Sequence, residues 1–275
     1  MAETEKPEQA DWATRGAYWV KTAPEGASTT DDLNQILISL AGIEPGVTVL
    51  DIASGAGDPA VSIALKVGPQ GSVTAFDANP EMLVGARGRA EKMELQNINF
   101  EIGRMEELPF ANESFDALTC RFGLMSAEDP VGVLEGARHV LKPGKKAAYM
   151  THGSRTKNTL YSVMRPAVLD FLGEPSGGGM ERRFRFSEFG SLETVFKAAG
   201  FTDIVEQEAS KTVTRDKGDR FWQTMLMRAF GARIEGLDEA RLEELHQCVE
   251  AAFEPYLKGD HYELLSTEMV ACGTA

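Results

Sequence analysis

From residue 47 onward, short apolar runs alternate with longer amphipathic stretches, and this alternation constrains the fold more than any other feature of the chain. The run VTVLDIA at residues 47–53 is rich in β-branched side chains and too short for a helix, so it predicts a buried strand. Similar runs predict strands at 72–77, 98–102, 115–121, 146–151 and 202–206, and a last one near 262–271. Strands separated by helical stretches are typical of a mostly parallel sheet covered by helices on both faces. We therefore expect an α/β chain with seven strands.

Capping residues and glycines mark the ends of the intervening helices. Asp58 and Asn79 each precede a proline, and a capping side chain followed by proline is typical of a helix start. A third helix is expected from about 130 to 141, where the segment KPG would end it. The segment SLETVFKAAG predicts a fourth helix that ends at Gly200.

Three regions lie outside this alternation and divide the chain into a main domain and its additions. Residues 1–32 are expected to form an N-terminal lid segment, and 33–275 the main domain. Insertions at about 155–187 and 216–258 interrupt the main domain, and the second predicts two helices. Open α/β sheets bind ligands beyond the carboxyl ends of their strands, so such additions are expected to cover a substrate.

Aromatic and sulfur-containing side chains near these additions are candidates for the wall of an apolar substrate pocket, although they could also simply fill the core of a lid. The candidates are Tyr18, Trp19, Phe122, Met125 and Trp222. A basic run at residues 182–185, preceded by Glu181, could grip an anionic group of the substrate or form a solvated loop.

The sharpest local motif is VLDIASGAGDP at residues 49–59, which predicts a strand, a glycine turn and a helix. Gly55 and Gly57 allow a ligand to approach the backbone closely, which suits an adenosine-containing cofactor at a helix N-terminus. A dinucleotide and S-adenosylmethionine both fit this description. Asp58 would repel a diphosphate there, so the phosphate-free cofactor is favoured. Asp77 ends the second strand, where a carboxylate can accept ribose hydroxyls of either cofactor.

Four segments in order, VLDIASGAGD, VTAFDANPEML, GRMEELPFANESFDALTCRFGLMSAEDP and ARHVLKPGKK, resemble the motifs of class I S-adenosylmethionine-dependent methyltransferases. The similarity is to the subgroup of the ubiquinone/menaquinone-biosynthesis C-methyltransferases, and it is strong over residues 33–152 and weak elsewhere. It implies a Rossmann-like fold with a mostly parallel seven-stranded sheet and helical lid insertions. It also implies S-adenosyl-L-methionine as cofactor and S-adenosyl-L-homocysteine as product.

The resemblance implies cofactor contacts at the positions that match the family motifs. The positions expected around the methionine part are Asp51, Ala53, Gly55 and Gly57, and Asp77 is expected at the ribose. Those expected at the adenine are Met82, Met105 and Glu106, and Arg121 is expected beside the methyl donor. Two positions depart from the family pattern. Ala53 stands where the family usually has its first glycine. Arg104 replaces an Asp that accepts from the adenine amino group in many relatives, so Glu106 or a backbone carbonyl would have to take over that contact.

His152 and Arg121 are the candidate catalytic residues. His152 directly follows the strand at 146–151, at the rim where a substrate should lie, so it is the expected general base, although the loop could turn it to solvent. The expected reaction is direct methyl transfer from the sulfonium to an O, N or C nucleophile of a small molecule such as a quinone, a phenol or a natural-product-like acceptor. The sequence contains no compact pattern of metal ligands, so no metal is expected.

Charge and cysteine usage limit the partners and the compartment. The chain has 28 Lys and Arg against 42 Asp and Glu, a net charge of −14, which would repel nucleic acid from most of the surface. Three scattered cysteines indicate a cytoplasmic protein, and the lack of a long apolar stretch indicates that it has no membrane span. The oligomeric state, monomer or homodimer, stays open. Three alternatives stay open: a protein of the same fold that binds S-adenosylmethionine without methylating, such as a cyclase or noncatalytic partner; a nicotinamide-dependent oxidoreductase; and an RNA methyltransferase.

Overall fold

The structure, a computed structural model, describes residues 16–22, 31–175 and 182–275. Its centre is one sheet with the strand order β3-β2-β1-β4-β5-β8-β6, and the short β7 pairs with β8 at one end. The strands are β1 (Thr48–Ile52), β2 (Ser72–Asp77), β3 (Ile98–Ile102), β4 (Phe115–Arg121), β5 (Leu141–His152), β6 (Thr202–Asp216), β7 (Leu257–Lys258) and β8 (His261–Thr274). The first five are mutually parallel, whereas β8 runs antiparallel between β5 and β6. The expected α/β sheet of seven main strands is confirmed.

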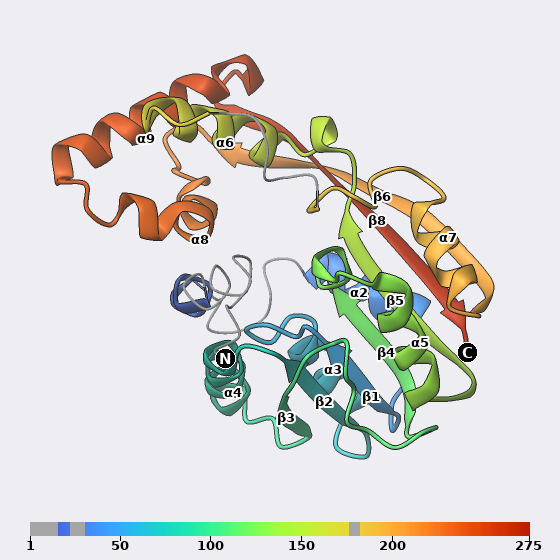
Figure 1. Cartoon of the computed structure of the whole chain (residues 1–275). Coiled ribbons are helices and arrows are strands. Elements are labelled where there is room, and N and C mark those ends of the chain that lie inside the picture. Colours follow the sequence, from blue (N-terminus) through green and yellow to red (C-terminus); the bar gives the residue numbers. More distant parts are fainter. Residues whose placement is uncertain (1–15, 23–30, 176–181) are drawn as a thin grey trace, which may run out of the picture.

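Helices cover both faces of the sheet (Figure 1). One face carries α2 (Asp31–Leu40), α3 (Ala60–Val67) and α4 (Pro80–Lys92), and the other carries α5 (Pro130–Val140) and α7 (Ser191–Ala198). Successive strand side chains point to opposite faces, so Val49 packs with α2 and α3 whereas Leu50 and Ile52 pack with α5 and α7. The near-continuous apolar runs of the sequence reflect this burial on both faces.

Three further helices pack on a two-stranded extension of the sheet. β5 ends where His152 pairs with Glu268, whereas β6 and β8 continue to the pair Asp216 and His261 (Figure 1). Around this ribbon lie α6 (Thr159–Phe171), α8 (Gln223–Ile234) and α9 (Glu239–Phe253), together called the helical unit. The remaining short helices are η1 (Leu124–Ser126), η2 (Arg155–Lys157) and η3 (Glu254–Tyr256). The predicted pair of helices in 216–258 is therefore present as α8 and α9.

Strands β6 and β8 are longer than the sequence predicted. The strand predicted at 202–206 continues to Asp216, and its added residues are mostly polar and exposed. Such residues show no buried alternating face, so only their pairing with β8 reveals the strand.

The helix ends test the capping predictions. Asn79 accepts hydrogen bonds from the backbone N–H groups of Glu81 and Met82 at the start of α4, as predicted. Gly200, with φ of 82°, ends the segment after α7, also as predicted. The prediction that Asp58 caps α3 is wrong, because Pro59 occupies the cap position and the Asp58 carboxylate instead pairs with Arg89.

A short helix over residues 16–21 connects the two parts of the molecule. Its Tyr18 ring packs against Gly231 of α8, where a Cβ would come within 2.5 Å of the ring, and Val20 packs against Gly85 of α4. The guanidinium of Arg228 lies 4.2 Å from the centroid of the Trp19 ring. Most of the N-terminal segment, Glu181 and the glycine run at 177–179 lie outside the described residues.

Two kinds of feature, a membrane-spanning helix and a metal-binding cluster, are absent from the described residues. Within residues 16–22, 31–175 and 182–275, no helix has both the length and the apolar character needed to cross a bilayer. Over the same ranges, no three His, Cys, Asp or Glu side chains come together in a way that could hold a metal ion.

Candidate active site

The turn after β1 has backbone angles that open a space for a ligand. Ala53, Gly55 and Gly57 have φ of 55°, 54° and 97°, in the left-handed region that favours glycine. A Cβ placed on Gly55 would meet no atom within 4 Å, whereas one on Gly57 would press on Val61 and Ala86. Gly55 therefore faces open space, and Gly57 permits close packing of the turn on α3 and α4. Ala53 adopts its glycine-like angle at a cost of about 1 kcal/mol.

Asp77 supports this turn from the end of β2. One carboxylate oxygen accepts from the backbone N–H of Gly55 at 2.8 Å, and the other accepts from the N–H of Asn79, also at 2.8 Å. Burial raises the pKa of this carboxyl, and the backbone donors oppose that shift. An ionised carboxylate has more lone pairs than these two bonds use, so Asp77 can still accept hydroxyl groups of a ligand.

Asp51 is a fully buried carboxyl group in β1 behind the turn. The hydroxyl of Thr119 in β4 donates to it at 2.6 Å. Burial, the largest influence, raises the pKa of Asp51 to about 7. Nearby, the hydroxyl oxygen of Ser54 is buried and has no hydrogen-bond partner among the described residues.

Asp58, at the end of the turn, belongs to a buried ionic network. Nη1 of Arg89 lies 3.0 Å from its carboxylate, and Nη2 of Arg121 lies 3.5 Å from it. Nη1 of Arg121 also donates to the side chain of Asn34 in α2 at 2.7 Å. Two guanidinium groups on one carboxylate leave no net negative charge at this point. The expectation that Asp58 repels a diphosphate electrostatically therefore fails, and the choice of cofactor needs other evidence.

The residues after β4 lie directly on the turn. Phe122 has φ of 61°, an unusual angle for a bulky side chain and one that is common at functional sites. A Cβ on Gly123 would come within 2.6 Å of the Cβ of Ala53, and the methyl carbon of Met105 is close by. Only glycine fits at position 123, because the β4 and β1 loops are in close contact there.

His152 is buried at the end of β5, at the same edge of the sheet. Its Nδ1 lies 3.1 Å from a carboxylate oxygen of Glu268 in β8, and its ring stacks on Phe122 with centroids 4.3 Å apart. Nη1 of Arg183 lies 3.3 Å from Nε2. Arginine offers only donors, so Nε2 accepts from Arg183, and the protonated Nδ1 donates a hydrogen bond to Glu268. Burial, reinforced by the positive charges of Arg183 and Arg121, lowers the pKa of His152, whereas Glu268 opposes that shift. These groups make His152 a neutral imidazole with a fixed tautomer.

The structure distributes the other predicted site residues between this edge and elsewhere. Met82 is buried at the start of α4, and Met105 packs against the core beside Gly123. Glu106 is exposed and lies 3.4 Å from Arg104. Trp222 is fully buried in the helical unit, where its indole donates to His246, and Met125 is buried in the core against α5.

Sequence reasoning missed Glu268 and did not single out Arg183 from its basic run. Glu268 lies 116 residues from His152, and only the register of β8 against β5 brings the two together. A lone Glu in an apolar strand, TEMVAC, was the available signal, because a buried carboxylate needs a partner.

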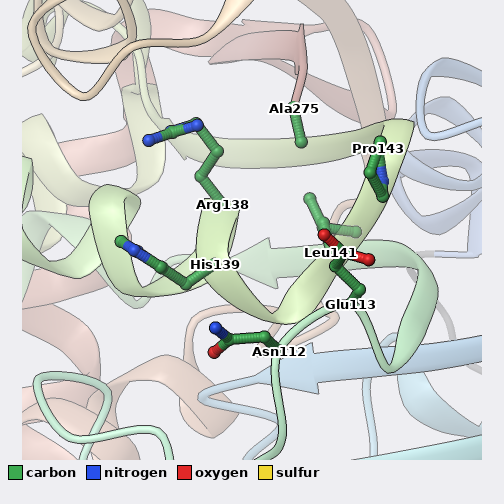
Figure 2. A pocket seen from close by; sticks show the side chains of 7 residues that line it. All are labelled: Asn112, Glu113, Arg138, His139, Leu141, Pro143 and Ala275. Carbon is green, nitrogen blue, oxygen red and sulfur yellow. The ribbon is translucent and has the colours of Figure 1, made fainter.

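A separate cavity of about 350 Å³ lies at the other end of the parallel strands (Figure 2). Leu141, where β5 begins, and Ala275 are among its lining residues. It is therefore remote from the turn after β1 and from His152.

Comparison with known proteins gives the evidence for the cofactor. Residues 43–168 match the family described as methyltransferase domain. Demethylmenaquinone methyltransferase of Listeria welshimeri is 36% identical over 111 residues, which make up 40% of this chain and 47% of that protein. The chain thus spans about half the length of the curated relatives it matches.

Solved structures with this fold extend over nearly the whole chain. The cyclase SpnF aligns with a TM-score of 0.60 at 18% identity and covers 97% of this chain and 94% of its own. Phosphoethanolamine N-methyltransferase 2 of Haemonchus contortus, solved with S-adenosylhomocysteine, has a TM-score of 0.58 at 17% identity and covers 98% of this chain and 58% of its own. At these identities the similarity is one of fold. The family match, the sequence relative and the strand order together identify a class I S-adenosylmethionine-dependent methyltransferase domain in this chain.

Proposed function

We propose that this chain transfers the methyl group of S-adenosylmethionine to an O, N or C nucleophile of a small organic molecule, such as a quinone, a phenol or a natural-product-like compound. One observation carries the proposal. The ligand-facing turn with Asp77 and the buried pair of His152 and Glu268 lie at the same edge of one sheet, joined by Phe122.

The residues at the turn fit the cofactor. Asp77 would accept the ribose hydroxyls with its remaining lone pairs, and the open space at Gly55 would admit the methionine part. The buried carboxyl of Asp51 supplies negative potential toward an ammonium group. By resemblance, Met82 and Met105 would contact the adenine, and Glu106 its edge. Arg121 then acts mainly through Asp58 and Asn34, holding the turn in place.

His152 is the general base in this proposal, for acceptors that must lose a proton. When bound, S-adenosylmethionine supplies an electrophilic methyl group that needs alignment and exclusion of water more than activation. Nε2 of His152 accepts from Arg183 in the ligand-free structure, so this hydrogen bond must break before Nε2 can take the acceptor proton. Glu268 then stabilises the resulting imidazolium through Nδ1–H. The lowered pKa of His152 keeps the imidazole neutral, and so able to accept a proton, near neutral pH.

The elements around His152 would form the acceptor pocket. Phe122 would contribute its ring, which stacks on His152. Tyr18 and Trp19, which contact Gly231 and Arg228 of α8, would close the space from the N-terminal helix. In this proposal 1–32, 155–187 and 216–258 act as lids over a domain at 33–275. Trp222 and Met125 are omitted from the proposed pocket because they are core residues. The net charge of −14 favours a small molecule over nucleic acid as acceptor. In this proposal the protein is a cytoplasmic monomer or homodimer.

Calorimetric titration followed by a turnover assay tests the proposal. S-adenosylhomocysteine should bind, NADH should not, and a panel of phenols, quinones and amines should yield S-adenosylhomocysteine from S-adenosylmethionine. Cofactor binding without turnover over the whole panel would favour a cyclase or noncatalytic role. Binding of NADH alone would overturn the proposal, and salt-sensitive binding of RNA would point to an RNA substrate.

A further inference from the structure

Arg183 is a partly buried cation that no described carboxylate neutralises. Its two hydrogen-bond contacts, to Nε2 of His152 at 3.3 Å and to the hydroxyl of Tyr161 at 3.1 Å, both use Nη1. Its guanidinium also lies 5.0 Å from the centroid of the Tyr161 ring. Within the described parts of the chain, Nε and Nη2 have no acceptor. A guanidinium presents its N–H groups as a planar fork, so one usable edge of that fork has no partner among the described residues.

The surroundings of Arg183 add positive potential. The positive charges of Arg183 and Arg121 both act on His152, and Arg165 of α6 lies within electrostatic range of Arg183. Glu268, the carboxylate that contacts His152, is also bonded to the hydroxyl of Ser266. Arg183, beside a neutral histidine and with other positive charges in electrostatic range, is therefore suited to bind an anion that the ligand supplies.

Aromatic rings surround the same point. Phe122, Tyr161 and Phe184 have ring centroids 4.3, 5.1 and 5.8 Å from that of His152. All three rings and Arg183 are only partly buried. A ligand that reaches Arg183 would therefore meet apolar ring faces next to a cationic fork, a combination that suits a flat apolar body with one anionic oxygen group.

We propose that Arg183 is a substrate-binding residue that pairs with an oxyanion, a carboxylate or a phosphate, on an aromatic methyl acceptor. This inference rests on the proposed function and narrows its substrate class. The anion takes the free edge of the guanidinium and holds the acceptor beside Nε2 of His152. Neutral acceptors lack this anchor and bind more weakly.

The test uses three small probes on the full chain loaded with S-adenosylhomocysteine. Benzoate and phenyl phosphate supply the two anion types, and benzamide is the neutral counterpart of benzoate. Their dissociation constants are measured by ligand-detected NMR for the wild type, for Arg183→Gln and for the control Arg182→Gln, which removes the same charge from an exposed neighbour. Arg183→Lys keeps the positive charge but lacks the planar guanidinium, so it distinguishes the contribution of charge to anion binding from that of the guanidinium geometry.

The expected result is saturable binding of at least one anion, weakened about tenfold or more by Arg183→Gln, because a charge-assisted pair is worth more than about 1.4 kcal/mol. Arg182→Gln should change it less than about twofold, since surface charges contribute little. The anion that responds identifies carboxylate or phosphate. Equal binding of benzamide and benzoate, an unaffected Arg183→Gln, or no anion binding at millimolar concentration would overturn the inference.

Binding of S-adenosylhomocysteine, measured first on every variant, keeps the two proposals apart. If the cofactor product binds and the anions do not, only the role of Arg183 fails. If it does not bind to the wild type, the proposed function fails, and the inference falls with it. A variant that retains cofactor affinity is folded, so its loss of anion binding is specific.

Discussion

Two carboxyl groups, the buried Asp51 and the partly buried Asp77, stand behind the glycine turn, and their hydrogen bonds give them different roles. Asp77 accepts two backbone N–H groups and shapes the turn. Asp51 accepts from Thr119 and is enclosed in the sheet, so its charge is costly without a cation nearby. The motif VLDIASGAGD placed Asp51 in a strand, but its environment depended on the packing of β4 against β1.

Asp77→Ala should weaken the binding of S-adenosylhomocysteine by about tenfold or more, because hydrogen bonds to a charged group contribute about 1.5–3 kcal/mol. Isothermal titration calorimetry measures the change. Asp116→Ala is a matched control, since Asp116 is near the opposite end of the strands, where it accepts from the backbone of Thr48. Equal affinity in Asp77→Ala and wild type would remove Asp77 from the site.

Asp51→Asn should stabilise the ligand-free protein, and more so at higher pH. The folded pKa of Asp51 is about 7 against an ordinary 3.8, so the folded state binds the proton more tightly than the unfolded state. Wild-type stability is therefore lost between pH 4 and 7 as the pH rises, at up to about 1.4 kcal/mol per pH unit. Urea unfolding at pH 5 and pH 8 measures the difference between variant and wild type, which should grow with pH. A constant difference would contradict the raised pKa.

Glu268→Gln should lower the pKa of His152 further, because both the hydrogen bond and the charge of Glu268 raise it. Histidine NMR titration detects this shift without any acceptor. If the pKa of His152 were the same in Glu268→Gln and the wild type, Glu268 would not be the residue that positions His152.

Once an acceptor is known, His152→Gln should reduce kcat by about 10²-fold or more with little change in cofactor affinity.

At the level of helices and strands, local signals worked where the cause was local. The predicted cap at Asn79 depends on a side chain within three residues of the N–H groups it accepts from. Asp129, which was not predicted as a cap, acts in the same way at the start of α5. Asp58 looked the same in sequence, but a buried Arg89 in α4 needed a carboxylate and took it. The outer half of β6 had no apolar periodicity and was missed, since its strand form comes from pairing with β8.

Asp129→Ala tests how much a helix cap contributes to the free energy of unfolding. It removes the bond from the N–H of Gly132 at the start of α5, and should cost about 1 kcal/mol of unfolding free energy. Chemical denaturation measures the loss, and S-adenosylhomocysteine affinity should be unchanged because the lost bond joins Asp129 to Gly132 and involves no residue of the turn after β1. A loss well above about 2 kcal/mol would show that Asp129 does more than cap the helix.

The whole molecule combines a sheet domain and the helical unit, each with its own core. The apolar cluster of the helical unit includes Trp222, Phe230 and Phe253 and is separate from the two clusters that flank the sheet. Arg228 of α8 donates to Thr22 and contacts Trp19, which ties the N-terminal helix to that unit. In the proposed function the acceptor binds between these parts, so their relative position would set the shape of its pocket.

Trp222→Ala should loosen the helical unit selectively. Removing a fully buried Trp costs about 3–5 kcal/mol, and here the loss falls on the core shared by α8 and α9. Hydrogen exchange followed by mass spectrometry should show faster exchange in these helices with β1, β2 and β4 unchanged. Uniformly faster exchange across the chain would mean that the two parts unfold as one unit.

The order of strands and helices, the glycine turn and Asp77 at the end of its strand were all readable from the chain, because burial periodicity and backbone angles are properties of neighbouring residues. The family resemblance supplied the cofactor, whereas the electrostatic argument from Asp58 failed. Only the tertiary structure decided which residues pair with Asp58 and that Glu268 pairs with His152. It also decided which edge of the Arg183 guanidinium has no described partner. Strand register and helix docking determine which distant charges meet, and no local pattern encodes that pairing.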